Sequence, residues 1–365
     1  MRRLWVFLSL TVVLVAMASY AVLMLTDSTN LADIATDTNV ETTENLDEVT
    51  GESQFHPFAG RDADPNSPVL ILKIDNSPDA RPHTGLQAAD LVYVEEIEGG
   101  YNRFVAVYSS NFPREVGPVR SARISDLDLI AQFGRPAFGY SGAQSRLIPE
   151  LKSADFIDVS GLTGPAGWVR DPNRVGPYDF MARPAGLLER AAAIGEVSSA
   201  KDIGLKFGET PMVGGWSVTD VEVKYPATRI GFEWDSIENG WVVLLDGEPD
   251  VDTYTKKPVV ASSVVIPIVQ QSSSGFTDKW GGVTPKQETI GEGAALVLRD
   301  GKAMWARWSR QSAQEGIRIT KDGQDVALAP GQIWFVLTNR ATRVLANPPH
   351  SGAAPVARQI GSQAS

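Results

Sequence analysis

The chain has 365 residues, of which 44 are Asp or Glu, 33 are Lys or Arg, three are His and none is Cys. Without thiols it can form no disulfide, cysteine nucleophile, thiolate metal site or lipid-modified cysteine. With three histidines we expect no metal centre, and no motif predicts a cofactor. The net charge of −11 argues against a nucleic-acid partner, which would require a basic surface. This length predicts about two domains.

Residues 1–26 are predicted to form a membrane anchor or a signal segment. Arg2 and Arg3 precede an uncharged run at 4–25, long enough to cross the roughly 30 Å hydrocarbon core as a helix. A cleaved signal peptide is the alternative, because Ala16 and Ala18 provide a small-residue cleavage pattern. The charges predict a single pass through the cytoplasmic membrane with the N-terminus inside, or a secreted protein if the segment is cleaved.

The next segment, at 27–68, is predicted to be an acidic disordered tether. It contains ten acidic side chains and one basic side chain, Arg61, among Thr, Asn and Ser. Such a composition cannot bury enough apolar surface to fold. We expect a second flexible segment, the tail at 346–365, which is rich in Ala, Gly, Ser and Gln.

The region at 69–210 mixes strand and helix patterns. Strands are expected at 69–75, 91–97 and 103–109, and helices at 121–133, 144–152 and 184–194. Gly99 and Gly100 predict a turn that makes a hairpin of the second and third strands. Ser121 is placed to cap the first helix and Gly134 to end it. These patterns predict an α/β domain.

The region at 216–345 is predicted to be a mostly antiparallel β domain. Four turn signals separate apolar or alternating runs, at Asn239 and Gly240, Asp246 and Gly247, Asp300 and Gly301, and Asp322 and Gly323. The stretch from Gly204 to Gly215 is the expected linker between the two domains. The predicted fold class is therefore α+β, with an α/β domain followed by a mostly antiparallel β domain.

Acidic residues gather where the first predicted strands end. Asp75 ends the first strand, and Glu95, Glu96 and Glu98 crowd the hairpin, with Arg103 across its turn. Strand alternation places Glu96 and Glu98 on one face and Glu95 on the other. A glycosidase needs two carboxyl groups, one as proton donor and the other as base or nucleophile. Glu98 with Asp75 or Glu95 is therefore a candidate catalytic pair. The alternative is a solvated sheet edge whose acids pair with Arg103.

Two arginines stand at the start of the helix predicted at 121–133. The helix dipole disfavours positive charge there, so Arg120 and Arg123 are expected to have an anionic partner. That partner is either an anionic ligand, held by the guanidinium groups and free helix amides, or the acids of the neighbouring hairpin. Asp126 can satisfy part of the charge of Arg123. The candidate ligand-binding residues of this polar cleft are Asn76, Arg81, Arg103, Arg120, Ser121, Arg123 and Ser141.

Ser141 also lies between a predicted strand and a predicted helix, which is the context of a nucleophile elbow. The motif is incomplete, because Ala143 occupies the second glycine position and His83 is the only plausible base. A tight turn is the favoured interpretation. Six aromatic residues of the β region belong either to the core or to a sugar-stacking surface, with the core favoured: Trp241, Tyr254, Trp280, Trp305, Trp308 and Trp334.

Several of these motifs resemble a known family. The runs IDNSPDARPHTGLQAADLVY, EGGYNRF and GPVRSAR resemble the N-terminal part of the YerB-like family, domain of unknown function 3048. GEGAALVLRDGKAMWARWSR and LAPGQIW are similar to its C-terminal part, and the resemblance covers about 55–340. It implies a secreted or membrane-anchored envelope protein whose first domain is a layered mixed α/β sandwich. It implies no established reaction.

The sequence departs from the family pattern in three places. The lipidated cysteine common among relatives is absent. Pro177, Tyr178 and Asp179 stand where relatives tend to read Pro, His and Asn, and Ser263 stands where Asn is expected. The residues that match are Asp75, Glu98, Arg103, Arg120, Ser121 and Arg123.

Two functions follow as hypotheses. The first is a binding or scaffolding module for a wall or surface glycan, or for an envelope protein, in which arginines hold anionic groups. The second is a metal-independent cell-wall glycan hydrolase or lyase that uses Glu98 with Asp75 or Glu95. Whether the chain is an enzyme is left open at this point. Besides these partners, the chain is expected to contact the membrane through 4–25.

Overall fold

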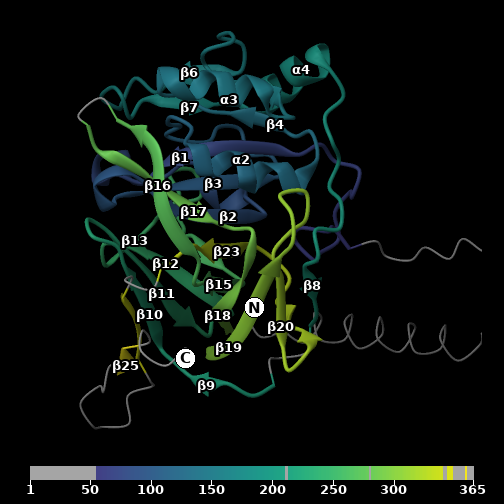
Figure 1. Cartoon of the computed structure of the whole chain (residues 1–365), viewed down its shortest axis with the longest axis vertical. Helices are drawn as coiled ribbons and strands as arrows, with labels where there is room; N and C mark the ends of the chain where they lie inside the picture. Colours follow the sequence, from purple (N-terminus) through teal and green to yellow (C-terminus); the bar gives the residue numbers. More distant parts are fainter. Residues whose placement is uncertain (1–54, 210–212, 279–280, 340–342, 348–357, 360–365) are drawn as a thin grey trace, which may run out of the picture. The chain divides into compact units, whose positions relative to one another are not determined.

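The structure, a computed structural model, describes residues 55–209, 213–278, 281–339, 343–347 and 358–359. Its main element is a twelve-stranded mixed sheet built from both halves of the sequence (Figure 1). In spatial order the strands are β21 (Gln324–Asp325), β20 (Arg318–Lys321), β19 (Lys302–Arg310), β18 (Gly291–Arg299), β15 (Ser263–Pro267), β23 (Ile333–Val336), β2 (Leu91–Glu96), β3 (Asn102–Tyr108), β1 (Leu70–Asp75), β4 (Ala137–Gly139) and β5 (Ile157–Asp158), with β9 (Trp216–Ser217) beside β19.

One strand joins the two halves of this sheet. β23 pairs in parallel with β2 on one side and with β15 on the other. β15, β18, β19, β20 and β21 are antiparallel neighbours in that order, and so are β2, β3 and β1. The predicted α+β class is thereby confirmed, with a mixed α/β first half and a mostly antiparallel second half. The regions expected as separate domains, 69–210 and 216–345, share one sheet.

A second, antiparallel sheet covers one face of the main sheet. Its strands are β13 (Glu248–Pro249), β12 (Gly240–Leu245), β11 (Arg229–Asp235), β10 (Asp220–Lys224), β24 (Arg343–Asn347) and β25 (Arg358–Gln359), with β14 (Val260–Ala261) beside β12. The four predicted turns are confirmed, because their first residues have φ between 48° and 55°, the left-handed region that Asn and Asp tolerate. Side chains from both sheets form one continuous core between them.

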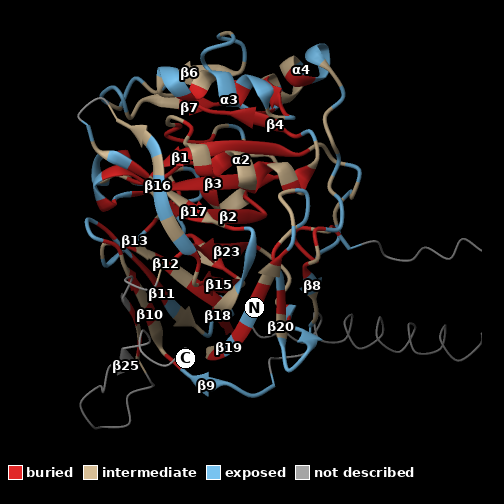
Figure 2. Cartoon of the chain, viewed as in Figure 1, coloured by how far each residue is buried: buried red, intermediate tan, exposed pale blue. Residues whose placement is uncertain are grey.

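The helices cover parts of both faces of the main sheet. They are α2 (Ile124–Ile130), α3 (Ile148–Ser153) and α4 (Pro184–Ile194), with short 3₁₀ helices η1 (Pro78–Ala80), η2 (Leu86–Ala88), η3 (Glu98–Gly100), η4 (Ala131–Phe133) and η5 (Ser145–Leu147). α2 and α3 contribute to a second core on the face opposite the second sheet. β1, β2 and β3 are buried on both faces (Figure 2), which explains their nearly continuous apolar runs.

The predicted cap of the first helix is wrong. The segment from Arg120 to Ala122 is not helical, and α2 begins after Arg123, whose backbone is extended. The reason is that this segment bonds to two neighbours. The Arg120 N–H donates to the Lys73 carbonyl at 2.8 Å, and the Ala122 N–H donates to the Gly142 carbonyl at 2.9 Å.

Three two-stranded pairs stand apart from the sheets. They are β6 (Trp168–Arg170) with β7 (Phe180–Ala182), β8 (Lys206–Phe207) with β22 (Ala327–Leu328), and β16 (Gln270–Thr277) with β17 (Val283–Glu288). The hairpin of β16 and β17, which we call the arm, is largely pale blue and tan in Figure 2. Its second strand packs against α2, η3 and β2, so the second half of the chain reaches the first.

The limits of the predicted tether and tail need correction. His56, Phe58 and Ala59 are fully buried, although they belong to the segment predicted as tether at 27–68. An aromatic cluster explains this, since Phe58 packs edge-on against Phe133 with ring centroids 5.3 Å apart. At the other end, Ala346 of β24 pairs with Arg358 of β25, and both residues lie in the region predicted as a tail.

The predicted anchor, at 4–25, lies outside the described residues, as does most of the tether. Within the described ranges, none of the helices has the length and apolar character needed to span a membrane.

The shared sheet predicts that both halves unfold together. Trp334 on β23 is fully buried and contacts Phe104 and Phe232, which belong to the first half and to the second sheet. We expect Trp334→Ala to lower the free energy of unfolding by about 3–5 kcal/mol. The control Trp305→Ala, on β19 and 36% exposed, should cost less than about 1 kcal/mol. Urea unfolding followed by circular dichroism and tyrosine fluorescence measures both; separate transitions for the halves would contradict the expectation.

Candidate functional site

A row of charged side chains crosses the ends of the three central strands. In register, Asp75 of β1 lies opposite Arg103 of β3, and Arg103 lies opposite Glu95 of β2. Lys73 of β1 faces the same side, because side chains alternate along a strand. This is the face that α2 covers. The sheet register therefore brings together carboxylates and an arginine that are far apart in sequence.

The inner part of the site is a fully buried ion cluster. The Lys73 ammonium contacts the Glu95 carboxyl group and lies 2.6 Å from Oδ1 of Asp126 on α2. Burial raises the pKa of Glu95 to about 8; Lys73 opposes this shift and Asp126 reinforces it. Glu95, predicted as a catalytic residue, is 1% exposed, so a polymeric substrate would not reach it in this conformation.

Glu98 is held by residues from both halves of the chain. It lies in η3, beyond the end of the strand, and its Oε2 accepts two hydrogen bonds from Arg123 at 2.7 and 3.0 Å. Its Oε1 accepts a hydrogen bond from the hydroxyl of Thr284 on the arm. Burial raises the pKa of Glu98, but the bonds from Arg123 and Thr284 outweigh it and leave the pKa below its ordinary value. The carboxylate therefore stays ionised at neutral pH.

Arg120 is the most accessible cation of the row. Its Nε lies 2.9 Å from Oδ2 of Asp75, although neither atom makes an aligned hydrogen bond. Tyr178, from the loop between β6 and β7, places its ring 5.7 Å from the guanidinium carbon. The two terminal nitrogens of Arg120 have no hydrogen bond or ion pair to any residue in the described part of the chain. They are therefore available to a ligand.

Arg103 is nearly buried, at 6% exposure, between the other two arginines. Its Nη1 donates to the Ser121 carbonyl at 2.8 Å, while its Nε has no partner among the described residues. Burial and the charges of Arg123 and Arg120 lower the pKa of Arg103 to about 9, and Asp75 opposes them. Arg103, Arg120 and Arg123 are thus crowded and only partly neutralised, which favours uptake of an anion.

Two predicted serines border this cluster. The Ser141 N–H donates to the Arg120 carbonyl at 3.0 Å, so Ser121 and Ser141 lie on neighbouring stretches of backbone. The expectation that free backbone amides at the start of α2 help to hold an anionic ligand is not supported. α2 has seven residues, and Asp126 already accepts the Arg123 N–H at 2.6 Å.

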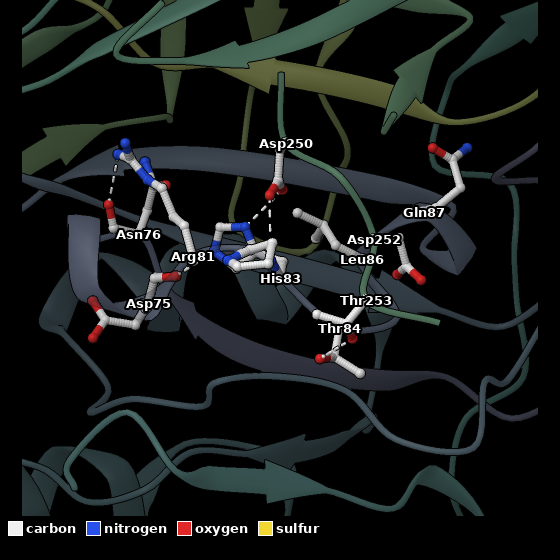
Figure 3. Close-up of polar contacts among 12 residues, drawn as sticks. Asp75, Asn76, Arg81, His83, Thr84, Leu86, Gln87, Asp250, Asp252 and Thr253 are labelled. Carbon is white, nitrogen blue, oxygen red and sulfur yellow. Dashed lines mark hydrogen bonds and ion pairs between the residues drawn. The ribbon is translucent and has the colours of Figure 1, made fainter. Parts of the chain in front are cut away.

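His83 does not serve Ser141 as a base. Its ring is fully buried, with Nδ1 2.6 Å from Oδ2 of Asp250 and Nε2 2.7 Å from the Asp75 carbonyl. Burial raises the pKa of Asp250, but His83 and Arg81 more than compensate and leave it lowered. In Figure 3 this pair lies where the loop at 250–253 meets the segment at 75–87. His83 therefore holds the two halves together.

Asn76 and Arg81, predicted as ligand-binding residues, belong to the same contact between halves (Figure 3). Arg81 donates to the Asn76 side chain at 3.0 Å and to Asp246 of the second sheet at 2.7 Å. The amide of Asn76 donates to Asn102. We place these side chains in the seam, defined as the contact of residues 75–87 with residues 246–260. The remaining predicted residues stay at the arginine cluster.

Four residues that contribute to the site were not among the predicted catalytic or ligand-binding residues: Lys73, Asp126, Tyr178 and Thr284. A lysine inside the apolar strand LILKID was a usable signal, since a buried ammonium requires carboxylate partners. Asp126 was noticed only as a neighbour of Arg123. Thr284 carried no signal, because only the tertiary fold brings the arm to Glu98. No group of three or more His, Asp or Glu residues in the described ranges is arranged to hold a metal ion.

Comparisons with known proteins identify relatives of this architecture. The family model "Protein of unknown function (DUF3048) N-terminal domain" matches residues 57–199, and its C-terminal counterpart matches 221–335. A Bacillus subtilis (strain 168) protein named "Putative lipoprotein YerB" is 27% identical over 282 residues, covering 73% of this chain and 80% of that protein. The crystal structure of YerB from Bacillus subtilis aligns with a TM-score of 0.66 and 23% identity, over 79% of this chain and 98% of that chain. This second likeness concerns the fold.

The buried cluster predicts a pH-dependent stability. Because the pKa of Glu95 rises from 4.5 to about 8 on folding, the native state binds more protons than the unfolded state between these values. The free energy of unfolding should therefore fall as pH rises from 4.5 to 8, by at most about 1.4 kcal/mol per pH unit from this group. Glu95→Gln should flatten that part of the profile in urea titrations at pH 5 and pH 8. Equal slopes in both proteins would refute the assignment.

Proposed function

Because the chain belongs to the family defined by the DUF3048 N- and C-terminal domains, we propose that it is an extracytoplasmic binding module of the bacterial cell envelope. In this proposal Arg120, supported by Arg103 and Arg123, holds an anionic group of a wall or surface glycan. The family itself supplies no reaction, so the proposal rests on the geometry of the arginine cluster.

The observation that carries the proposal is the surplus of guanidinium groups. Three arginines share the two carboxylates of Asp75 and Glu98. Arg120 keeps its terminal N–H groups for a ligand, and Arg103 keeps a buried Nε without a partner among the described residues. A guanidinium group binds carboxylate or phosphate through paired hydrogen bonds, which makes an anion the matching ligand.

A neighbouring groove offers room for sugar residues. It has a volume of about 490 Å³ and is lined by Gly161–Pro165, Trp168–Arg170 and Phe180. Trp168 and Phe180 stack with ring centroids 4.6 Å apart. The Phe180 carbonyl accepts the Val119 N–H at 2.7 Å, one residue before Arg120. A glycan with an acidic substituent could thus contact both features.

The proposed location in the cell envelope is supported by the name of the relative as well as by the sequence. The Bacillus subtilis relative is named a lipoprotein, and this chain contains no cysteine that could be lipidated. In our proposal the apolar run at 4–25 takes over the role of the lipid anchor. Cleavage of that run would release a secreted form.

Glycan hydrolysis is the less favoured function. A glycosidase requires a protonated carboxylic acid beside the scissile bond. The lowered pKa of Glu98 keeps that carboxylate ionised, Asp75 is paired with Arg120, and Glu95 is buried. The carboxylates of this site hold arginines, which is the arrangement expected of a binding site.

The test is co-sedimentation of the full-length protein, in mild detergent, with purified cell-wall sacculi. We expect wild-type protein in the pellet, with affinity that weakens as salt increases. Arg120→Ala should weaken binding at least about tenfold, since charge-assisted hydrogen bonds of this kind contribute roughly 1.5–3 kcal/mol. Arg307→Ala is the matched control, because it removes an exposed arginine of the second half that pairs with Glu292.

The supernatant of the same experiment distinguishes the alternatives. Soluble wall fragments that disappear in Glu98→Gln would replace the binding proposal with the hydrolase. Absence of wild-type protein from the pellet would reject wall glycan as the ligand and favour an envelope protein partner. Equal binding by wild type and Arg120→Ala would reject the arginine cluster as the site.

A further inference from the structure

We propose that the group held by Arg120 is the carboxylate at the C-terminal end of a peptide, and that Asp75 accepts a hydrogen bond from the peptide N–H beside it. This inference rests on the proposed binding function. It narrows the ligand from any anion to one kind of chain end, such as a peptide carried by a wall polymer.

The charge of the cluster matches a group with a single negative charge. Arg103, Arg120 and Arg123 face Asp75 and Glu98, which leaves one positive charge. The inner cluster adds none, because Lys73 balances Asp126 while the raised pKa of Glu95 keeps that carboxyl protonated at neutral pH. A carboxylate or a phosphodiester carries one negative charge, whereas a phosphate monoester carries nearly two.

Asp75 distinguishes between these two monoanions. Its Oδ1 accepts the Ser77 N–H at 3.2 Å, and among the described residues its buried Oδ2 makes no hydrogen bond and has an ion-pair contact with the unaligned Arg120 Nε alone. When Arg120 turns toward a ligand, Oδ2 loses that contact, and a buried carboxylate oxygen without a donor is unfavourable. The ligand therefore has to supply a donor. A phosphodiester has none, whereas the last residue of a peptide carries an N–H next to its carboxylate.

The access to the cluster favours a chain end. The side chains of Arg120 and Arg123 are 25% and 14% exposed, and that of Asp75 is 5% exposed. The loop at 171–179 crosses this region: Tyr178 lies over Arg120, and Arg174 donates to the carbonyls of Ala80 and Pro82. The end of an extended chain needs less room to reach Asp75 beside this loop than a pyranose ring that carries its own acid group.

The test compares small probes by isothermal titration calorimetry on the full-length protein. The probes are N-acetyl-Ala-Ala, its ester analogue N-acetyl-Ala-lactate, N-acetyl-Ala-Ala-amide, dimethyl phosphate and glucuronate. The ester replaces the critical N–H by oxygen and keeps the carboxylate. We expect the peptide acid to bind wild type about tenfold more tightly than the ester, the effect of one hydrogen bond to a charged group. The peptide amide, dimethyl phosphate and glucuronate should bind more weakly than the peptide acid.

Variants of Asp75 locate the acceptor. In Asp75→Ala the preference for peptide over ester should fall to about onefold, because the acceptor is absent. If Asp75→Ala fails to fold, Asp75→Asn is the substitute, because it keeps the shape of the side chain. This variant should also reduce the preference for peptide over ester. Asp79→Ala removes an exposed acid of the same segment and should leave the preference unchanged. Circular dichroism melts establish folding of each variant.

The outcomes separate this inference from the function on which it rests. Equal affinity for peptide and ester in wild type, or an undiminished preference in folded Asp75 variants, would overturn the role of Asp75. Binding of glucuronate or dimethyl phosphate as tight as that of the peptide acid, lost in Arg120→Ala, would overturn the peptide while retaining the anion site. Binding of none of the anions would overturn both proposals.

Discussion

The parallel pairing of β23 with β2 is the constraint on which the rest of this structure depends. β23 comes from the end of the chain and lies between β2 and β15, so a strand of the second half completes the core of the first. With this pairing the second sheet lies over one face, and the arm reaches η3 at the end of β2. The contacts of Asp250 with His83 and of Thr284 with Glu98 both follow from that placement.

The arginine cluster illustrates how a sheet can hold several like charges close together. The ladder fixes Arg103 between Asp75 and Glu95, while the segment at 119–120, which bonds to the strand at 70–75, brings Arg120 alongside. Asp75 and Glu98 each already pair with one arginine, so Arg103 has no carboxylate of its own. Burial therefore lowers its pKa, and its Nε lacks a hydrogen-bond partner among the described residues. A site left short of negative charge in this way is suited to bind an anion, with the buried Lys73 cluster as its rigid support.

Much of the local structure was predictable from the sequence. The limits of α4 match the prediction from Pro184 at the first turn and Gly195 beyond the end, since both effects depend on neighbouring residues only. The family resemblance, based on five sequence motifs, is also confirmed. The cap of α2 was predicted wrongly, because Ser121 is a typical capping residue, but its neighbours Arg120 and Ala122 donate their N–H groups to Lys73 and Gly142 and keep this segment out of the helix.

By itself the sequence determined the α+β class, the family, the turns with Asn or Asp before Gly, and the concentration of charge in the segments around Asp75, Glu98 and Arg120. These features depend on composition, periodicity and short-range backbone preferences. Only the tertiary structure decided that the halves share one sheet, that Asn76 and Arg81 serve the seam, and that Glu98 holds an arginine. The physical reason is that burial and long-range pairing set the partner and pKa of each charged group, and residues nearly 200 positions apart, such as Glu98 and Thr284, become neighbours only through the sheet.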